Sequence, residues 1–151
     1  MSMNFTLSLM SIILYILFLF LSSTVVSIAA DTSSISQSQP LSYGKTMVPP
    51  RGIFELGFFN LGNPNKIYLG IRYKNISLQN VVWVANGGNP VKDSTVILKL
   101  NSSGNLVLTY NNTIVWSTSS PKAAQNPVAE LLDSGNLVIG KNPSPHRLEI
   151  R

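Results

Sequence analysis

Apolar residues in this chain occur in short runs, some alternating with polar residues, and clusters of Gly, Pro, Asn and Ser separate them. After residue 30, no stretch places apolar residues at helical spacing over three turns. Alternation is typical of a β-strand, whose successive side chains point to opposite faces. The runs therefore predict strands over residues 53–59, 67–73, 81–85, 96–100, 106–110, 113–116, 128–132 and 137–139. Regularly spaced short strands predict one all-β domain, built as a sandwich, barrel or prism.

A repeated segment indicates how these strands are grouped. Residues 103–107 and 134–138 both read Ser-Gly-Asn-Leu-Val, and Val-Val-Trp at 81–83 resembles Ile-Val-Trp at 114–116. Internal repeats are typical of folds in which copies of one small unit bury their apolar faces against each other. We expect three units, the third opening at Gly135. Residues 146–149 take the place where this unit would carry its Trp, so we expect the third unit to be incomplete.

The first thirty residues have a different character. They contain no charged side chain and include an apolar run of ten, Ile12–Leu21, followed by the small residues of Ser27–Ala29. This pattern is typical of a secretory signal peptide, whereas a membrane-spanning helix needs about 20 apolar residues. We therefore expect a cleaved signal at 1–30, a folded domain at 31–142 and a tail outside the domain at 143–151. The mature chain is then secreted and has no membrane span.

Composition narrows the range of functions. The chain of 151 residues has no Cys, which leaves neither a disulfide framework nor a thiolate site. Its net charge is +5, but the basic residues are scattered singly, so no nucleic-acid partner is expected. The one His, His146, lies in a Pro-rich segment and supports no catalytic triad or metal cluster. Asp93, Glu130 and Asp133 have no spacing that suggests a glycosidase pair, so we expect no enzyme activity, cofactor or metal.

Four blocks of sequence resemble a known family. They are Phe54–Phe59, Tyr68–Lys74, Val81–Asn86 and Leu131–Val138. In this order they resemble the bulb-type lectin domain that begins plant S-domain (S-locus, or G-type lectin) receptor-like serine/threonine-protein kinases. The resemblance implies a β-prism of three four-stranded sheets around a pseudo-threefold axis, with Trp side chains near that axis. In such receptors a membrane helix and a cytoplasmic kinase follow, so the chain resembles an N-terminal fragment, at the plasma membrane only as part of a longer receptor.

The resemblance also implies candidate sugar-binding positions. Related bulb lectins bind mannose through Gln-x-Asp-x-Asn-x-Val-x-Tyr on each sheet, where alternate residues share one face of a strand. The matching positions are Asn101, Ser103, Asn105, Val107 and Thr109 in the second unit, Leu132, Ser134, Asn136, Val138 and Gly140 in the third, and approximately Asn65, Ile67, Leu69, Ile71 and Tyr73 in the first. Each unit lacks the Asp, so we expect degenerate sites in which Asn105 and Asn136 serve as turn residues beside Gly. The second unit, with Asn101, Ser103, Asn105 and Val107, is the best candidate for a surviving site.

Further features bear on the function. N-glycosylation sequons begin at Asn75, Asn101 and Asn111, and a glycan on Asn101 would obstruct the candidate site. Trp83 and Trp116 are expected in the core. The leading hypothesis is a secreted, non-enzymatic, lectin-like recognition domain whose partners are weakly bound mannose-type glycans or related receptor ectodomains. The alternatives are a working mannose-binding lectin and a fragment of a full-length receptor kinase.

Overall fold

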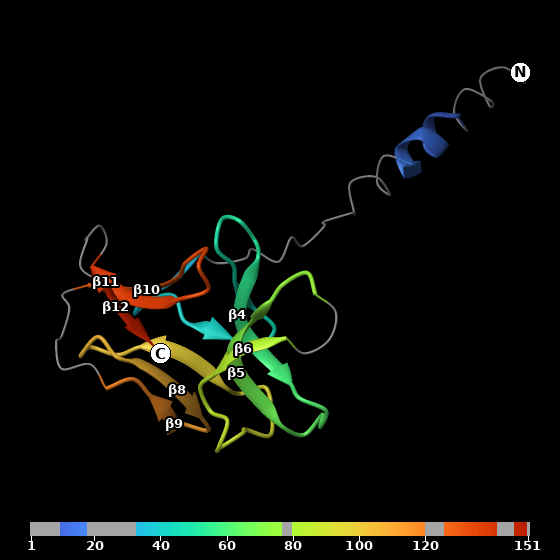
Figure 1. The fold of residues 1–151 in the computed structure, drawn as a ribbon. Coiled ribbons are helices and arrows are strands. Elements are labelled where there is room, and N and C mark those ends of the chain that lie inside the picture. Colours follow the sequence, from blue (N-terminus) through green and yellow to red (C-terminus); the bar gives the residue numbers. More distant parts are fainter. Residues whose placement is uncertain (1–9, 18–32, 77–79, 120–125, 142–146, 151) are drawn as a thin grey trace, which may run out of the picture. The chain divides into compact units, whose positions relative to one another are not determined.

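The computed structural model describes residues 10–17, 33–76, 80–119, 126–141 and 147–150 (Figure 1). The chain divides into two units, residues 1–30 and residues 31–151. In the first unit, residues 10–17 form a helix. Within the described residues, no helix is long and apolar enough to cross a membrane. In the described part of the second unit every regular element is a β-strand, as the pattern of short apolar runs predicts.

The described strands form three four-stranded antiparallel sheets. The first sheet has the order β3 (Thr46–Met47), β4 (Phe54–Asn60), β5 (Ile67–Tyr73) and β6 (Val81–Val84). The second has the order β2 (Leu41–Ser42), β7 (Ile97–Leu100), β8 (Leu106–Tyr110) and β9 (Thr113–Ser117). The third has the order β1 (Ser34–Ile35), β10 (Pro127–Leu131), β11 (Leu137–Lys141) and β12 (Arg147–Ile150).

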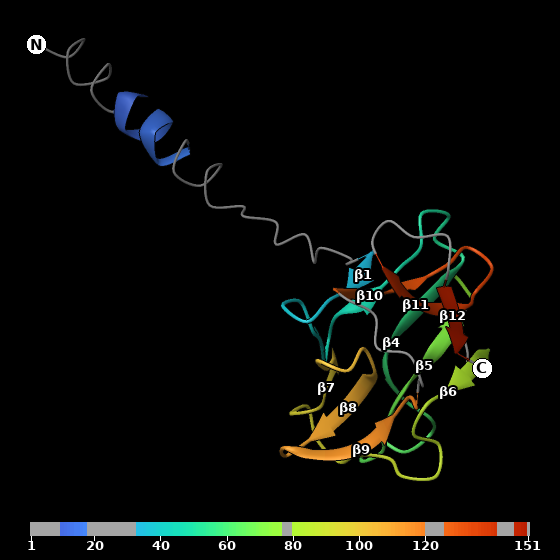
Figure 2. The same ribbon diagram turned by 90° about the vertical axis from the view of Figure 1, so that its left-hand side faces the viewer.

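The three sheets are copies of one unit. Each combines a two-residue strand from the segment 34–47 with three strands that follow one another along the chain. Figure 2 shows one such addition, β1 beside β10. The register repeats as well: Ile71 pairs with Trp83 in the first sheet, and Leu108 pairs with Trp116 in the second. The predicted β-prism of three four-stranded sheets is therefore confirmed.

The third sheet differs from our expectation. We expected the third unit to be incomplete and residues 143–151 to lie outside the domain. Instead, Arg147–Ile150 form β12, which pairs with β11 along its length, and Leu148 takes the register position of the Trp, opposite Ile139. The missing Trp misled the prediction, because the backbone hydrogen bonds that define an antiparallel strand do not require that side chain.

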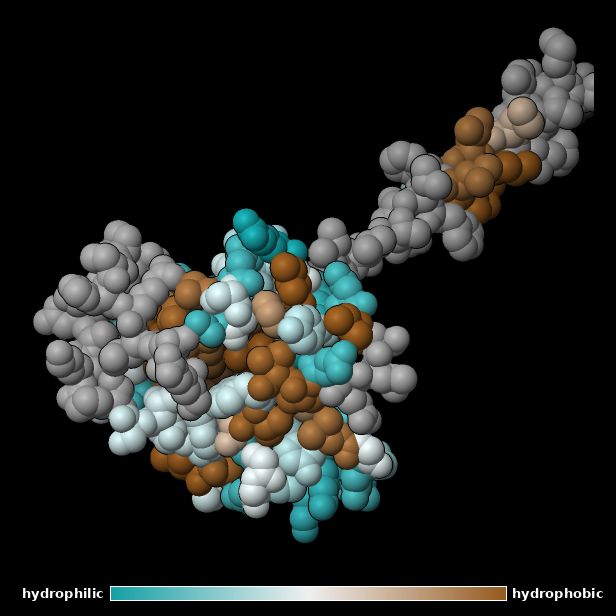
Figure 3. All heavy atoms as spheres, viewed as in Figure 1, coloured by the Kyte–Doolittle hydropathy of each residue, from teal (hydrophilic) through white to brown (hydrophobic). Residues whose placement is uncertain are grey.

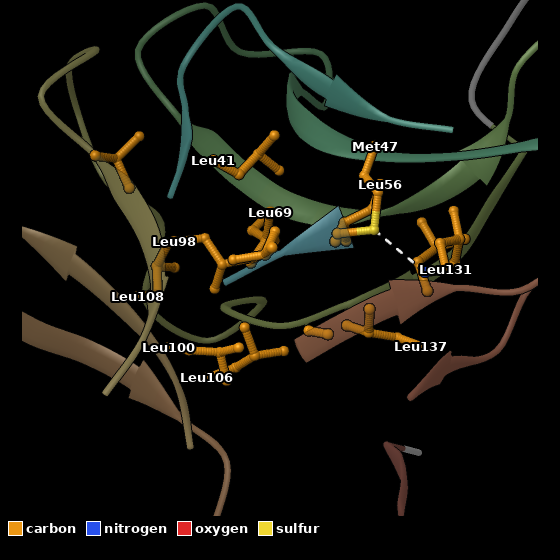
Figure 4. Close-up of a cluster of buried hydrophobic side chains, with 14 of the residues drawn as sticks. Leu41, Met47, Leu56, Leu69, Leu98, Leu100, Leu106, Leu108, Leu131 and Leu137 are labelled. Carbon is orange, nitrogen blue, oxygen red and sulfur yellow. Dashed lines mark hydrogen bonds between the residues drawn. The ribbon is translucent and has the colours of Figure 1, made fainter. Parts of the chain in front are cut away.

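The core lies between the sheets and is lined by the inward face of each (Figure 4). Its largest fully buried side chains are Ile35, Leu41, Met47, Leu56, Leu69, Val91, Val96, Leu98, Leu106, Leu108 and Leu137. Each two-residue strand supplies one of them, so even these short strands bury apolar surface. Trp83 and Trp116 pack against this cluster as predicted, with ring centroids 5.6 Å apart in an edge-to-face arrangement.

Met47 connects the first sheet with the third. Its Sδ accepts a hydrogen bond from the backbone N–H of Leu131 at 3.2 Å, drawn as the dashed line in Figure 4. A thioether is a weak acceptor. The donor is buried, however, and a buried N–H that has no acceptor destabilises the fold, so even a weak acceptor is favourable here. Met47 is therefore both a core side chain and a polar partner.

Asn86 fastens the segment that follows β6 to β5. The N–H of Leu69 donates to Asn86 Oδ1 at 2.8 Å, and Asn86 Nδ2 donates to the carbonyl oxygens of Ile67 and Asn89, both at 3.2 Å. The side chain thus replaces backbone pairing where β6 has ended. Only 3% of Asn86 is exposed, which makes these bonds strong determinants of the path of residues 86–91.

The surface of the first sheet is uneven in polarity. On the face shown in Figure 3, apolar residues gather in the middle of the view, where Figure 1 draws β5 and β6. Val82 on β6 is half exposed. Hydrophilic residues gather at the lower end of the same face. The turn between β4 and β5 and the segment after β6 are joined at the Ile67 end of β5.

Candidate functional site

The candidate residues of the second unit lie in and just after the turn between β7 and β8. The N–H of Asn105 donates to Asn101 Oδ1 at 2.9 Å, and the N–H of Asn101 donates to the carbonyl oxygen of Asn105, also at 2.9 Å. Gly104, with φ of 77°, donates its N–H to the carbonyl oxygen of Asn101. The structure therefore brings Asn101 and Asn105 together through bonds that close the turn, with the exposed Ser103 between them.

Side-chain contacts of this unit also join it to the segment after β9. Thr118 Oγ1 lies 3.3 Å from Asn105 Oδ1 and accepts the N–H of Leu106 at 2.9 Å. Val107 is only 3% exposed, which leaves almost no apolar surface on which a sugar ring could pack. The amide oxygens that a mannose site would use are thus already in contact with donors from the protein itself.

The third unit has the same turn with fewer polar groups. The N–H of Leu132 donates to the carbonyl oxygen of Asn136 at 2.9 Å, and Gly135 has φ of 83°. Ser134 and Asn136 are exposed, but the first motif position is Leu132, which has no amide. Val138 is buried and Gly140 has no side chain. This face offers a sugar few directional bonds.

The register corrects our assignment for the first unit. We matched the motif to Asn65, Ile67, Leu69, Ile71 and Tyr73, but the three middle residues are buried in the core. Gly70 pairs with Gly57 on the first sheet as Val107 pairs with Lys99 on the second, so Gly70 is the equivalent of Val107. The outward face that corresponds to the motif therefore belongs to the residues that alternate with Ile67, Leu69 and Ile71. That outward face of β5 carries Tyr68, Gly70 and Arg72.

The outward face of the first sheet is filled by the protein. The ring of Phe59 lies over Gly70, where a Cβ would come within 3.0 Å of it, and Phe59 is only 7% exposed. Arg72 Nε donates to Glu55 Oε1 at 2.6 Å, and its guanidinium carbon lies 5.8 Å from the centroid of the Phe59 ring. A sugar ring at this position would have to displace Phe59.

The carboxylate of Asp93 has a local structural role. Asp93 Oδ1 accepts hydrogen bonds from the hydroxyl and the N–H of Thr95 at 2.7 and 2.9 Å, and Oδ2 accepts one from the Tyr110 hydroxyl at 3.1 Å. The bonds from Thr95 lower the pKa of Asp93, and the bond to Asp93 raises the pKa of Tyr110. Within the described residues, no group of three or more His, Cys, Asp or Glu side chains could hold a metal.

The three sequon asparagines differ in accessibility. Asn75 and Asn111 are exposed, the latter with φ of 48° in the turn between β8 and β9. Asn101 is half-buried, and its Oδ1 holds the turn described above. Ser77, the third residue of the first sequon, lies outside the described residues. Asn101 is therefore the least accessible of the three side chains.

Comparison with known proteins adds a family to this geometry. Residues 80–148 match the family described as D-mannose binding lectin. A G-type lectin S-receptor-like serine/threonine-protein kinase of Arabidopsis thaliana is 44% identical over 121 residues, which cover 80% of this chain and 15% of the relative. The receptor-like serine/threonine-protein kinase SD1-8 of the same plant is 46% identical over 123 residues, or 79% of this chain and 14% of that protein. The chain thus spans about one seventh of the length of these relatives.

Two solved structures share the fold. A monomeric monocot mannose-binding lectin from Gastrodia elata has a TM-score of 0.59 and 22% identity, covering 77% of this chain and 91% of its own. The lectin of the Japanese Marasmius oreades has a TM-score of 0.55 and 19% identity, covering 72% of this chain and 81% of its own. At these identities the likeness concerns the arrangement of strands.

Proposed function

We propose that this lectin domain, which is related to mannose-binding lectins and to G-type lectin S-receptor-like kinases, is a non-enzymatic recognition domain with degenerate mannose sites. We further propose that it works outside the cell, with residues 1–30 as its signal peptide and a folded domain from residue 31 to β12. The kinase activity in the relatives' names is not proposed for this chain, whose matches concern a lectin region.

The state of the three outward faces supports degenerate sites. On the first sheet, Phe59 lies over Gly70, where a sugar would pack. On the second, Asn101 and Asn105 make contacts within the protein. On the third, the amide and carboxylate positions hold Leu132 and Ser134. A hydrogen bond to a charged group contributes about 1.5–3 kcal/mol, so loss of the motif Asp from each face removes much of the affinity for mannose.

A working mannose-binding lectin is the second candidate. The observation that favours it is the second unit, which keeps an amide at Asn101, an amide at Asn105 and the Val at 107 in alternate positions of one turn and strand. In this case Thr118 and a mannoside hydroxyl would share Asn105 Oδ1, which has two lone pairs.

Mannoside binding separates the two candidates. The secreted protein would be applied to an array of oligomannosides, with Asn105→Ala as the variant and Asn136→Ala, the equivalent residue of the third unit, as the matched control. We expect no mannoside-specific binding. Binding that Asn105→Ala abolishes and Asn136→Ala retains would overturn the proposed degeneracy, provided that both variants unfold at the temperature of the wild type within about 3 °C.

We propose glycosylation at Asn75 and Asn111 in the secreted protein. Both asparagines are exposed, whereas Asn101 is half-buried and has its amide oxygen in the turn. Mass spectrometry of peptides from protein secreted by plant cells would measure occupancy at each sequon. We expect the lowest occupancy at Asn101, and higher occupancy there than at Asn75 and Asn111 would refute this ranking.

A further inference from the structure

Two lysines, Lys66 and Lys92, flank an isolated β-bridge at the Ile67 end of β5. Ile67 and Val91 form an isolated antiparallel bridge, with N···O distances of 2.8 and 3.1 Å. Both side chains are buried in the core. Lys66 precedes Ile67 and Lys92 follows Val91, so both lysines lie on the same side of this antiparallel bridge, and both are exposed.

This arrangement of like charges has an energetic cost. Both ammonium groups line the same hollow, and like charges that lie close together repel each other. The ion pairs of Arg51 with Asp133 and of Arg72 with Glu55 involve neither lysine. An anion placed between the two ammonium groups would turn this repulsion into attraction.

The two lysines also line a hollow in the surface. Its other lining residues are Asn63, Asn65 and Pro90, so the hollow contains two cations and two amides and no carboxylate. Asp93 follows Lys92 in the sequence, but its oxygens accept hydrogen bonds from Thr95 and Tyr110. The polar groups of the hollow are therefore mainly hydrogen-bond donors, with amide oxygens as additional acceptors.

Backbone and side-chain bonds hold the hollow in shape. Asn60 Nδ2 donates to the carbonyl oxygens of Pro64 and Lys66, both at 2.9 Å, so one side chain braces the turn from within. Asn63 Oδ1 accepts the N–H of Asn65 at 2.9 Å, which leaves the Nδ2 of Asn63 as a donor. On the opposite side, Asn86 fixes the segment that leads to Lys92. The backbone of the hollow is thus preformed, and a ligand would have to order only the side chains that line it.

We propose that this hollow binds the carboxylate of an acidic sugar, with Lys66 and Lys92 on either side of the carboxylate and the amides of Asn63 and Asn65 at the ring hydroxyls. The inference rests on the proposed role as a recognition domain and names its ligand as a uronic-acid glycan. The net charge of +5 favours the approach of such a polyanion. Counted from Gly70, the equivalent of Val107, Lys66 takes the place of the motif Asp on the first sheet. The site is distinct from the mannose-motif positions of the second and third sheets.

Binding of an oligogalacturonate, measured by titration calorimetry, tests the proposal. The variants are Lys66→Gln and Lys92→Gln, and the control is Lys99→Gln, which removes the same charge from an exposed position on β7. We expect each hollow variant to weaken binding by about three- to fivefold and the control by less than twofold. The fully methyl-esterified oligomer, which lacks the carboxylates, should not bind. Equal weakening by all three variants, or equal binding of the ester, would show non-specific attraction and overturn the proposal.

Two further measurements complete the test. Thermal unfolding of Lys66→Gln and Lys92→Gln should occur at or slightly above the wild-type temperature, because each variant removes one of two like charges that line the same hollow. If inorganic phosphate displaces the oligogalacturonate at an equal concentration, the hollow is a general anion site and the sugar assignment fails. Absence of oligogalacturonate binding overturns this inference alone, whereas binding of an oligomannoside through Asn105 overturns the degenerate mannose sites.

Discussion

Replacement of Asn86 by Ala tests how much one buried amide contributes to the fold. The change removes three hydrogen bonds. The N–H of Leu69 is left without a partner, which costs about 1–3 kcal/mol for a buried donor. The carbonyl oxygen of Ile67 keeps the N–H of Val91, and the carbonyl oxygen of Asn89 lies nearer to solvent, so together they add about 1 kcal/mol. We therefore expect Asn86→Ala to lower the free energy of unfolding by about 2–4 kcal/mol.

Urea denaturation of the purified domain measures this difference, as the shift of the midpoint multiplied by the slope. Asn80→Ala, at an exposed asparagine next to β6, is the control and should stay within about 0.5 kcal/mol of the wild type. Hydrogen exchange adds a local readout, because the Leu69 amide should lose protection in Asn86→Ala. A loss below about 1 kcal/mol with unchanged protection of Leu69 would refute the reasoning.

Other substitutions test other parts of the structure. Gly70→Ala would place a Cβ 2.2 Å from a backbone oxygen of β6 and should destabilise the domain by about 1–3 kcal/mol in thermal or urea unfolding, whereas Gly88→Ala, which meets no atom within 4 Å, should be neutral; equal effects of the two would refute the contact. Met47→Leu keeps the apolar volume but removes the acceptor of a buried N–H, so urea denaturation should show a loss of about 1 kcal/mol, and an unchanged midpoint would show that the sulfur contact contributes nothing. The bond to Asp93 holds the pKa of Tyr110 above its ordinary value, and the stability that it contributes is present below that ordinary pKa and is lost as the pH rises through the folded-state pKa. Ultraviolet titration should therefore give a lower pKa for Tyr110 in Asp93→Asn, and no change would contradict the assigned bond.

The sequence predicted the long strands but not the short ones. The apolar runs located β4 to β11 to within about two residues, because clusters of turn residues bound each run. The strands Ser34–Ile35, Leu41–Ser42 and Thr46–Met47 were missed, since two residues cannot display alternation. Strand β12 was missed because we took its Trp as the sign of the element, whereas its pairing depends on the backbone.

The candidate site, too, could be predicted from the sequence only in part. In β5 the apolar residues Ile67, Leu69 and Ile71 occupy every second position, so the sequence alone indicates that they face the core. Our motif assignment should therefore have used the residues between them, which face outward. The filling of the outward face could not be read in this way. Phe59 comes from the neighbouring strand, and its position over Gly70 depends on the register between β4 and β5.

The pairing of β1 with β10 has a consequence for biosynthesis. Ser34 lies opposite Glu130, so the earliest strand of the domain joins a partner that is synthesised nearly a hundred residues later. The groups β4-β5-β6 and β7-β8-β9 need only neighbouring chain and can form while synthesis continues. Until β10 emerges, Ile35 has no sheet to join. Closure of the prism is therefore a late step, and chaperones that act during synthesis meet an open third face until that step occurs.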